Sequence, residues 1–334
     1  MVAPTRPRSP GARAVLVMLA LALLVTFGAG PAIAAPNSGR APLYYLALGD
    51  SLSRGVQPDP GGQNHPTDQG YADDLAAVGR LVLPQLQLVK LGCETEETTA
   101  SMLGLVPSQC PYDQQYQLAE AEAFLRAHRG ATVLVTIDIG ANDLSRCINR
   151  ATGTIDPACV QSTFAQAPAN LATILARLRA AAGPRVPIVG MNFYDPFLAA
   201  WLQGPAGQAL ARLSVQLVTQ YNDLLEGAYH GARVPVPVAD VEAAFSTTNF
   251  TDLVTLPAIG PVPVNVARIC QWSWMCAPPP QGPNIHGRPE GYRVMAGAFV
   301  AALIQAHLDD GPLAGHAEYL RAALHHLDPA AAAP

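Results

Sequence analysis

Five short apolar stretches, separated by segments of helical composition, constrain the fold of this chain more than any other sequence feature. Short apolar runs that end at Gly, Pro or polar residues are typical of strands buried in a sheet. We predict strands at residues 43–48, 86–91, 131–139, 186–191 and 234–238, the last near a sheet edge because it contains two prolines. Strands that alternate with helices indicate a parallel sheet with helices on both faces. The predicted fold is therefore α/β, a three-layer α/β/α sandwich with a five-stranded parallel sheet.

The segments between the strands are rich in residues that favour helices, such as Ala, Leu, Glu and Gln. We predict helices at residues 71–80, 115–128, 168–182, 197–229 and 291–308, with a break in the fourth at Gly204-Pro205. Residues 252–285 are rich in Pro and are predicted to form a long ordered loop. An Ala-rich tail follows about residue 312.

The N-terminal segment has the pattern of a secretory signal peptide. Arg6, Arg8 and Arg13 precede an apolar run at 14–29, and Ala32-Ile33-Ala34 follows as a small-residue cleavage site. A membrane anchor is the alternative, but the run is short for the ~20 residues that span a bilayer. We therefore expect a signal peptide at 1–34, a single domain at 35–334, secretion from the cell and no stable membrane anchor.

Cysteine usage agrees with export. All six cysteines follow residue 34, and an even number in an exported chain indicates three disulfides. The sequence allows other pairings, and we favour the local pairs Cys93–Cys110, Cys147–Cys159 and Cys270–Cys276. Zinc binding is the alternative, but the chain has no C-x-x-C or H-E-x-x-H motif. No metal or other cofactor is expected.

Composition limits the partners of the chain. Half of the residues are hydrophobic and 13% are charged, which excludes a disordered chain. The formal net charge is −5 and Lys90 is the single lysine, so the chain lacks the basic surface that nucleic acids require. We expect no nucleic-acid partner. The oligomeric state stays open, with a monomer as the default expectation.

Three predicted strands end at a glycine with polar residues close behind it. These segments are Gly49-Asp50-Ser51, Gly92, and Gly140-Ala141-Asn142-Asp143. Because sites in parallel sheets form beyond the carboxyl ends of the strands, we expect the three segments to face one crevice.

These segments resemble the sequence blocks of the GDSL, or SGNH, hydrolases. Gly49-Asp50-Ser51-Leu52-Ser53 resembles the nucleophile block, and the run from His286 to Tyr292 resembles the block with the family's histidine. The blocks occur in order between about residues 43 and 308, and the cysteine-rich loops look similar to those of secreted actinobacterial lipases and esterases. The resemblance implies the flavodoxin-like fold of SGNH hydrolases and the hydrolysis of carboxylic esters.

The resemblance also implies a role for each matching residue. Ser51 would be the nucleophile, although a serine between a strand and a helix is also a common helix cap. His286 would be the general base and then the acid for the leaving alcohol. The Asn142 amide, otherwise a turn residue, would form an oxyanion hole with the backbone N–H groups of Ser51 and Gly92. Asp50 and its counterpart Asp143 are expected to be structural.

One position departs from the family pattern. The family's block has an Asp three residues before the His, and Pro283 stands there in this chain. We therefore predict that a main-chain carbonyl at Pro283 orients His286, since apart from the amide of Asn284 the neighbouring residues offer nothing else. A distant acid is the alternative, with Asp240 and Asp252 as candidates.

The substrate is open at this stage. A lipid or another small-molecule acyl ester is the favoured substrate, an O-acetylated polysaccharide is the second, and a non-catalytic binding protein is an alternative of another class. Several large apolar side chains could line an acyl groove, form a sugar platform or belong to the core. They are Phe193, Tyr194, Phe197, Trp272, Trp274 and Met275.

Overall fold

The computed structural model describes residues 41–149, 154–307 and 327. The expected signal peptide and the Ala-rich tail beyond about residue 312, apart from Leu327, lie outside these residues. Contacts divide the chain after Arg40, and the fold is that of the unit that begins at Ala41.

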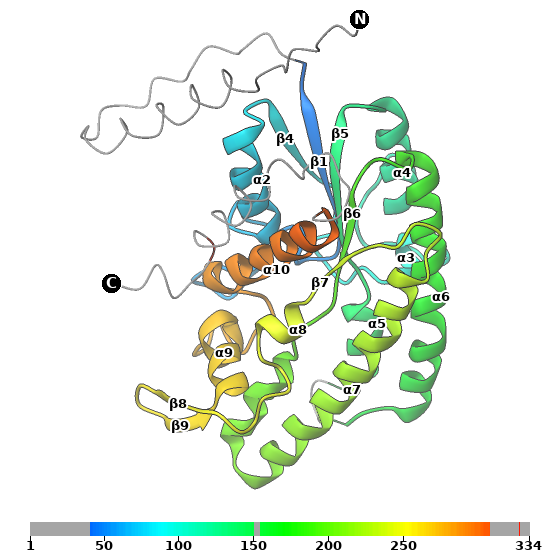
Figure 1. Cartoon of the computed structure of the whole chain (residues 1–334). Coiled ribbons are helices and arrows are strands. Elements are labelled where there is room, and N and C mark those ends of the chain that lie inside the picture. The colour runs from blue at the N-terminus through cyan, green and yellow to red at the C-terminus, as the bar shows by residue number, and fades with distance from the viewer. Residues whose placement is uncertain (1–40, 150–153, 308–326, 328–334) are drawn as a thin grey trace, which may run out of the picture. The chain divides into compact units, whose positions relative to one another are not determined.

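A five-stranded parallel sheet forms the centre of this unit (Figure 1). In spatial order its strands are β4 (Leu86–Lys90), β1 (Leu43–Gly49), β5 (Thr132–Asp138), β6 (Ile188–Met191) and β7 (Val238–Ala239). Tyr45 to Leu48 in β1 are fully buried, because β1 lies inside the sheet and both faces are covered. The predicted α/β sandwich with five parallel strands is confirmed.

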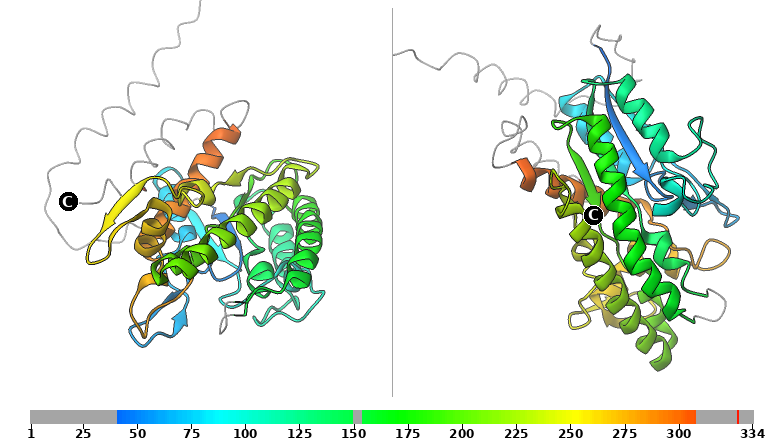
Figure 2. Two further views of the ribbon diagram at one scale, coloured as in Figure 1. Left: turned by 90° about the horizontal axis from the view of Figure 1, so that it is seen from below. Right: turned by 90° about the vertical axis from the view of Figure 1, so that its right-hand side faces the viewer.

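Two groups of helices cover the sheet, one on each face (Figures 1 and 2). On one face α2 (Tyr71–Val82) packs on α10 (Pro289–His307), with the rings of Tyr71 and Phe299 stacked at 4.7 Å. The other face carries the helices α4 (Gln117–Ala127), α6 (Pro157–Ala182) and α7 (Pro205–His230). The predicted break at Gly204-Pro205 separates α7 from the 3₁₀ helix η1 (Pro196–Gln203). No helix in the described part of the chain is long and apolar enough to cross a membrane.

The segment predicted as one long loop, 252–285, contains regular structure, so that prediction is wrong. An antiparallel hairpin of β8 (Leu253–Leu256) and β9 (Gly260–Pro263) is followed by α9 (Val264–Trp272) and the 3₁₀ helix η2 (Trp274–Cys276). A two-stranded hairpin has free outer edges, where prolines cost no ladder hydrogen bond. The proline content that suggested a loop is therefore compatible with strands here.

The described chain also contains several short elements and three disulfides. The short helices are α3 (Thr99–Met102), α5 (Ala141–Ser145) and α8 (Val241–Ala244), and a small hairpin pairs β2 (Gln57–Pro58) with β3 (Asn64–His65). The disulfides join Cys93 to Cys110, Cys147 to Cys159 and Cys270 to Cys276, which are the three local pairs that the spacing favoured.

The sheet order places the candidate residues together. Counting only the five parallel strands, the spatial order is second, first, third, fourth, fifth. The second strand therefore lies on one side of the first, and the later strands lie on its other side. A crevice opens at such a point beyond the carboxyl ends of the strands. Ser51 follows β1 and Asn142 follows β5, the two strands that flank this point.

Candidate active site

Ser51 lies in a tight turn directly after β1. Gly49 begins the turn with φ +132°, and a Cβ there would collide with the Asp138 side chain at the end of β5. Only glycine therefore fits where the two strands end side by side. The Val56 amide donates to the Ser51 carbonyl at 3.0 Å, which closes the turn. Because the next helix, α2, begins only at Tyr71, Ser51 caps no described helix.

His286 lies in the segment that precedes α10, and its ring meets Ser51. Its Nε2 is 2.9 Å from Oγ of Ser51, which is the distance that proton transfer requires. Both residues are buried, with 7% and 8% exposure. The Trp274 amide donates to the His286 carbonyl at 3.0 Å, and the Tyr194 hydroxyl donates to the Ile285 carbonyl. The backbone that carries the imidazole is thus held from two sides.

The group at Nδ1 of His286 differs from the predicted one. Oδ1 of Asn284 lies 2.7 Å from Nδ1, so the prediction of a main-chain carbonyl at Pro283 is wrong. The same oxygen accepts the backbone N–H of His286 at 3.0 Å, a local turn that asparagine forms readily. Because a backbone N–H can only donate, this bond identifies the atom as oxygen. Nδ1 therefore carries the proton, and Nε2 can accept one from Ser51.

The predicted oxyanion-hole residues border Asp50, the neighbour of Ser51. A Cβ on Gly92 would lie 3.1 Å from the Asp50 carbonyl oxygen. Nδ2 of Asn142 donates to Oδ2 of Asp50 at 3.1 Å and to the Glu97 carbonyl at 3.0 Å. Both N–H hydrogens of this amide already have acceptors, so a third oxygen would have to compete with Asp50 or Glu97 for the amide. Within the described residues, the backbone N–H groups of Ser51 and Gly92 donate to no protein acceptor.

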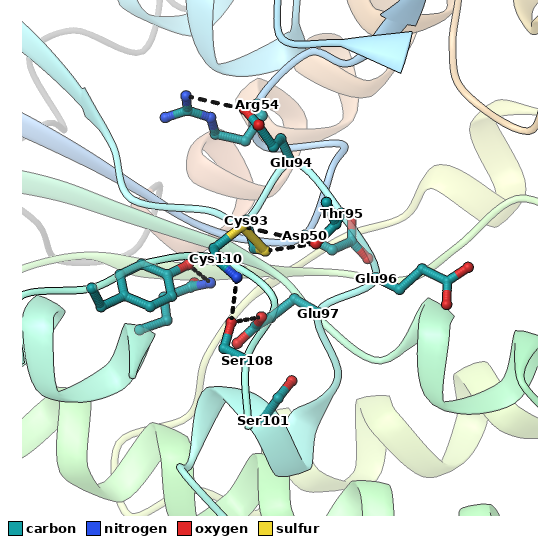
Figure 3. The surroundings of a disulfide bond; sticks show 12 residues. Asp50, Arg54, Cys93, Glu94, Thr95, Glu96, Glu97, Ser101, Ser108 and Cys110 are labelled. Atoms are coloured by element: carbon teal, nitrogen blue, oxygen red, sulfur yellow. Dashed lines mark hydrogen bonds and ion pairs between the residues drawn. A yellow bond between two sulfur atoms is a disulfide. The ribbon is translucent and has the colours of Figure 1, made fainter. Parts of the chain in front are cut away.

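The Cys93–Cys110 disulfide closes the loop that carries Glu97 (Figure 3). Cys93 directly follows Gly92. Inside the loop, the Ser108 hydroxyl donates to Oε2 of Glu97 at 2.7 Å and accepts the Cys110 N–H at 3.2 Å. These bonds fix the Glu97 segment, whose carbonyl orients Asn142.

Two buried carboxyl groups lie beneath the nucleophile turn. Burial raises the pKa of Asp50 to about 7. The pKa of Asp138 is raised by burial and by the nearby charge of Asp50. The Tyr71 hydroxyl donates to Oδ1 of Asp138 at 2.9 Å, and Oδ2 has no hydrogen-bond partner in the described structure. A proton on one of the two groups therefore stabilises this turn.

The other aspartates named in the sequence analysis have structural partners. Asp143 accepts the Thr99 hydroxyl and amide at 2.6 and 2.9 Å, and Asp240 caps α8 through the Ala243 amide at 2.9 Å. Asp252 accepts the Asn249 amide at 2.8 Å. The described residues contain no group of three His, Cys, Asp or Glu side chains that could hold a metal ion.

Part of the predicted apolar set belongs to the core. Phe193 and Tyr194 are each 5% exposed, and the Tyr194 ring stacks on Phe245 at 4.6 Å. Trp272 meets the same Phe245 edge-on at 5.2 Å. For these residues the structure favours the core alternative over a sugar platform. Tyr194 also holds the histidine segment through its hydrogen bond to the Ile285 carbonyl.

Residues 47–294 match the model of the GDSL-like Lipase/Acylhydrolase family. The chain belongs to this family. The matched range includes Ser51, Gly92, Asn142 and His286, so the resemblance seen in the sequence blocks is confirmed. No curated protein matches the chain significantly.

Three solved structures are distantly similar to the chain. The lipase Lip_vut3 from a goat rumen metagenome is 17% identical, with 81% of this chain and 99% of that chain covered and a TM-score of 0.48. The acetylxylan esterase Axe2 from Geobacillus stearothermophilus is 16% identical, with 78% and 94% covered and a TM-score of 0.45. Phospholipase A1 from Streptomyces albidoflavus NA297 is 17% identical, with 79% and 99% covered and a TM-score of 0.45.

Proposed function

We propose that this GDSL-family protein is a secreted carboxylester hydrolase that works through an acyl-enzyme on Ser51. The observation that carries the proposal is the 2.9 Å contact between Oγ of Ser51 and Nε2 of His286. The contact of Nδ1 with Asn284 sets the tautomer in which Nε2 accepts a proton. A buried serine with a correctly protonated base beside it is the arrangement that acyl transfer requires.

In the first half-reaction Oγ of Ser51 bonds to the ester carbonyl carbon while Nε2 of His286 takes the hydroxyl proton. The carbonyl π electrons move to oxygen, and the N–H groups of Ser51 and Gly92 stabilise that charge. Nδ2 of Asn142 adds a third donor when the oxyanion displaces Asp50 from one of its hydrogens. His286 then protonates the leaving alcohol, the C–O bond breaks, and Ser51 is acylated.

In the second half-reaction water replaces the alcohol. His286 removes a proton from the water as it attacks the acyl carbon, and returns that proton to Oγ when the acid leaves. Asn284 accepts the Nδ1–H throughout and so keeps the ring in one orientation. Its amide oxygen has only a partial charge, so it stabilises the imidazolium less than a carboxylate would.

We propose acyl esters of lipids or simple alcohols as the substrates, and the fold also contains an apolar groove. The groove, about 680 Å³ in volume, lies between α6 and α7 and is lined by Ile155, Val160, Phe164, Leu210, Leu213 and Leu217. Phe164 stacks on Tyr221 at 5.6 Å, and the Tyr221 hydroxyl donates to the Gly140 carbonyl, two residues before Asn142. The lining includes neither Ser51 nor His286, so the choice of substrate rests on the ester profile described below.

The three disulfides support secretion, because disulfides persist in oxidising compartments. The test is expression of the full chain in a secreting host. We expect activity in the medium and a mature N-terminus at Ala35, as read by mass spectrometry. Protein that stays in the cell with its N-terminus intact would contradict this part of the proposal.

Ester hydrolysis is tested with p-nitrophenyl esters from acetyl to palmitoyl, measured beside acetylated xylan. We expect turnover of the esters, and labelling of Ser51 alone by a fluorophosphonate probe. Ser51→Ala should lower kcat by at least about 10⁴-fold with an unchanged circular dichroism spectrum. Labelling of another serine, or an active Ser51→Ala variant, would refute the mechanism. Release of acetate from xylan without turnover of longer esters would instead favour the polysaccharide esterase.

A further inference from the structure

The small hairpin β2–β3 follows the nucleophile turn and is fastened to the rest of the fold at its base. Val56, which precedes β2, donates its N–H to the Ser51 carbonyl at 3.0 Å. The Val56 carbonyl accepts the Tyr292 hydroxyl of α10 at 2.8 Å. The hairpin thus starts from a point fixed to both the nucleophile segment and the helix that follows His286.

The far end of the hairpin contacts the loop that precedes His286. Gly62 has φ +83°, and a Cβ there would collide with the Pro280 carbonyl. Two residues on, Oδ1 of Asn64 accepts a hydrogen bond from Nδ2 of Asn284 at 2.7 Å. The left view of Figure 2 shows this blue hairpin beside the orange loop. One short hairpin therefore joins the serine segment to the histidine segment.

The contact with Asn64 bears on the orientation of the Asn284 amide. In the observed orientation the amide oxygen faces Nδ1 and the backbone N–H of His286, and Nδ2 faces an acceptor on Asn64. A half-turn of the amide would place its NH₂ against the backbone N–H and Nδ1. The imidazole could then accept at Nδ1 only as the Nε2–H tautomer, which cannot take the proton of Ser51.

We propose that Asn64 is a positioning residue for catalysis, which holds the Asn284 amide in the orientation that keeps Nε2 of His286 basic. The proposal rests on the proposed ester hydrolysis. Asn64 touches neither substrate nor reacting atoms in this role; it acts through Asn284. The chain of contacts runs from Asn64 through Asn284 and His286 to Ser51, with successive polar distances of 2.7, 2.7 and 2.9 Å.

The first test compares three single variants on one ester substrate. Asn64→Leu removes the acceptor, Asn64→Asp keeps it, and Gln63→Leu makes the same amide-to-leucine change at the neighbouring exposed position. We expect Asn64→Leu to lower kcat about tenfold, or ~1.4 kcal/mol in activation free energy, with KM within about twofold. Asn64→Asp and Gln63→Leu should keep kcat within about twofold. An unchanged kcat in Asn64→Leu, or an equal loss in Asn64→Asp, would overturn the proposal.

The second test reads the tautomer without turnover, using ¹⁵N-labelled histidine and NMR. The His286 signals are assigned by their loss in His286→Gln. The ¹⁵N shifts should show a protonated Nδ1 in the wild type and Asn64→Asp, and a shift toward the Nε2–H form in Asn64→Leu. Identical shifts in wild type and Asn64→Leu would overturn the role of Asn64. A wild type that shows the expected tautomer but cleaves no ester would refute the proposed function alone.

Discussion

At the scale of single residues, Asn284 sets this site apart, because a neutral amide occupies the place of an acid. A triad acid fixes the tautomer of the histidine and also stabilises the imidazolium that forms during the reaction. The Asn284 oxygen, 2.7 Å from Nδ1 of His286, can perform the first task fully. The surrounding dipoles must then stabilise the imidazolium. A charge at position 284 should therefore shift the pH dependence of activity strongly.

Asn284→Asp should move the acid limb of the pH profile to higher pH. A carboxylate beside Nδ1–H favours the protonated ring, which raises the pKa of His286, typically by about 1 to 3 units for such a pair. The base must be neutral to act, so kcat/KM should begin to fall at a pH about one unit higher than in the wild type. The measurement is kcat/KM of a soluble ester across the acid range.

Asn284→Ala is the companion variant, because it removes the acceptor without adding a charge. It should lower kcat by about 10- to 100-fold and move the acid limb little. An Asn284→Asp profile that coincides with the wild-type profile would mean that this side chain does not face the ring during catalysis.

The sequence predicts that Ser51 and His286 act together, and the structure brings them into contact, but the sequence favours a backbone carbonyl at Pro283 over the amide of Asn284, which the structure places at Nδ1. Ser51 and His286 are brought together by the fold because their blocks follow β1 and precede α10, and such blocks are visible in a sequence. The family's acid position, three residues before the histidine, is Pro283 in this chain, so the family pattern directs attention to that residue. The sequence also contains a local indication for Asn284, because an asparagine side chain readily accepts the backbone N–H two residues further on, here that of His286. Only the folded loop shows that the same oxygen then reaches the ring.

At the scale of elements, apolar runs predicted the sheet well and failed at chain segments with many prolines. The clearest run, 131–139, became β5 (Thr132–Asp138), whereas the edge run 234–238 yielded only β7 (Val238–Ala239). Buried β-branched side chains stabilise a strand inside the sheet. At the edge, Pro235 and Pro237 have no N–H to donate to a neighbouring strand, so β7 begins only at Val238. Two residues per strand leave no periodicity to detect. The sequence pattern therefore does not predict the short β2–β3 hairpin or its turn at Pro60-Gly61-Gly62.

Helix α6 begins eleven residues earlier than the predicted start at residue 168. Proline is favoured in the first turn of a helix, so Pro168 is compatible with a helix that starts there. The actual start is capped by Asp156, whose side chain accepts the N–H groups of Ala158 and Cys159. Pro168 lies inside the helix, and burial of apolar side chains on either side of it, such as Val160 and Leu171, offsets the lost hydrogen bond. Tertiary packing of this kind is not readable from local sequence.

The disulfide loops give a prediction at this scale. In the chain-entropy model the stabilisation grows with loop length. Loss of Cys93–Cys110, with a separation of 17 residues, should lower the free energy of unfolding by about 3 kcal/mol. Loss of Cys270–Cys276, with a separation of 6, should cost about 2 kcal/mol. The measurement is urea unfolding of the two double Cys→Ser variants.

The Cys93–Cys110 variant should also lose activity beyond its loss of stability, because its loop carries the Glu97 carbonyl that orients Asn142. The comparison is made well below the unfolding transition of each variant. A larger loss of stability from Cys270–Cys276 than from Cys93–Cys110 would contradict the loop-length argument.

At the scale of the whole molecule, several carboxyl groups are buried by the fold and favour the protonated state. Burial raises the pKa of Asp50 and of Asp195 to about 7. Asp195 is fully buried, accepts the Ser214 hydroxyl at 2.6 Å and caps η1 through the Phe197 amide at 2.9 Å. A pKa that is raised in the folded state means that the native protein holds protons that the unfolded chain has already released.

Stability from these groups should therefore be complete below the unfolded pKa of about 4 and fall as the pH rises through about 7. Asp195→Asn imitates the protonated carboxyl and removes one titration. The Tm of this variant minus that of the wild type should become more positive by about 5 °C between pH 4 and pH 7. Asp113→Asn, at an exposed position, controls for the loss of one negative charge. A difference that stays constant across this range, or that grows equally in Asp113→Asn, would show that folding does not raise the pKa of Asp195. The cost of burying its carboxylate would then be met by its bonds to Ser214 and Phe197.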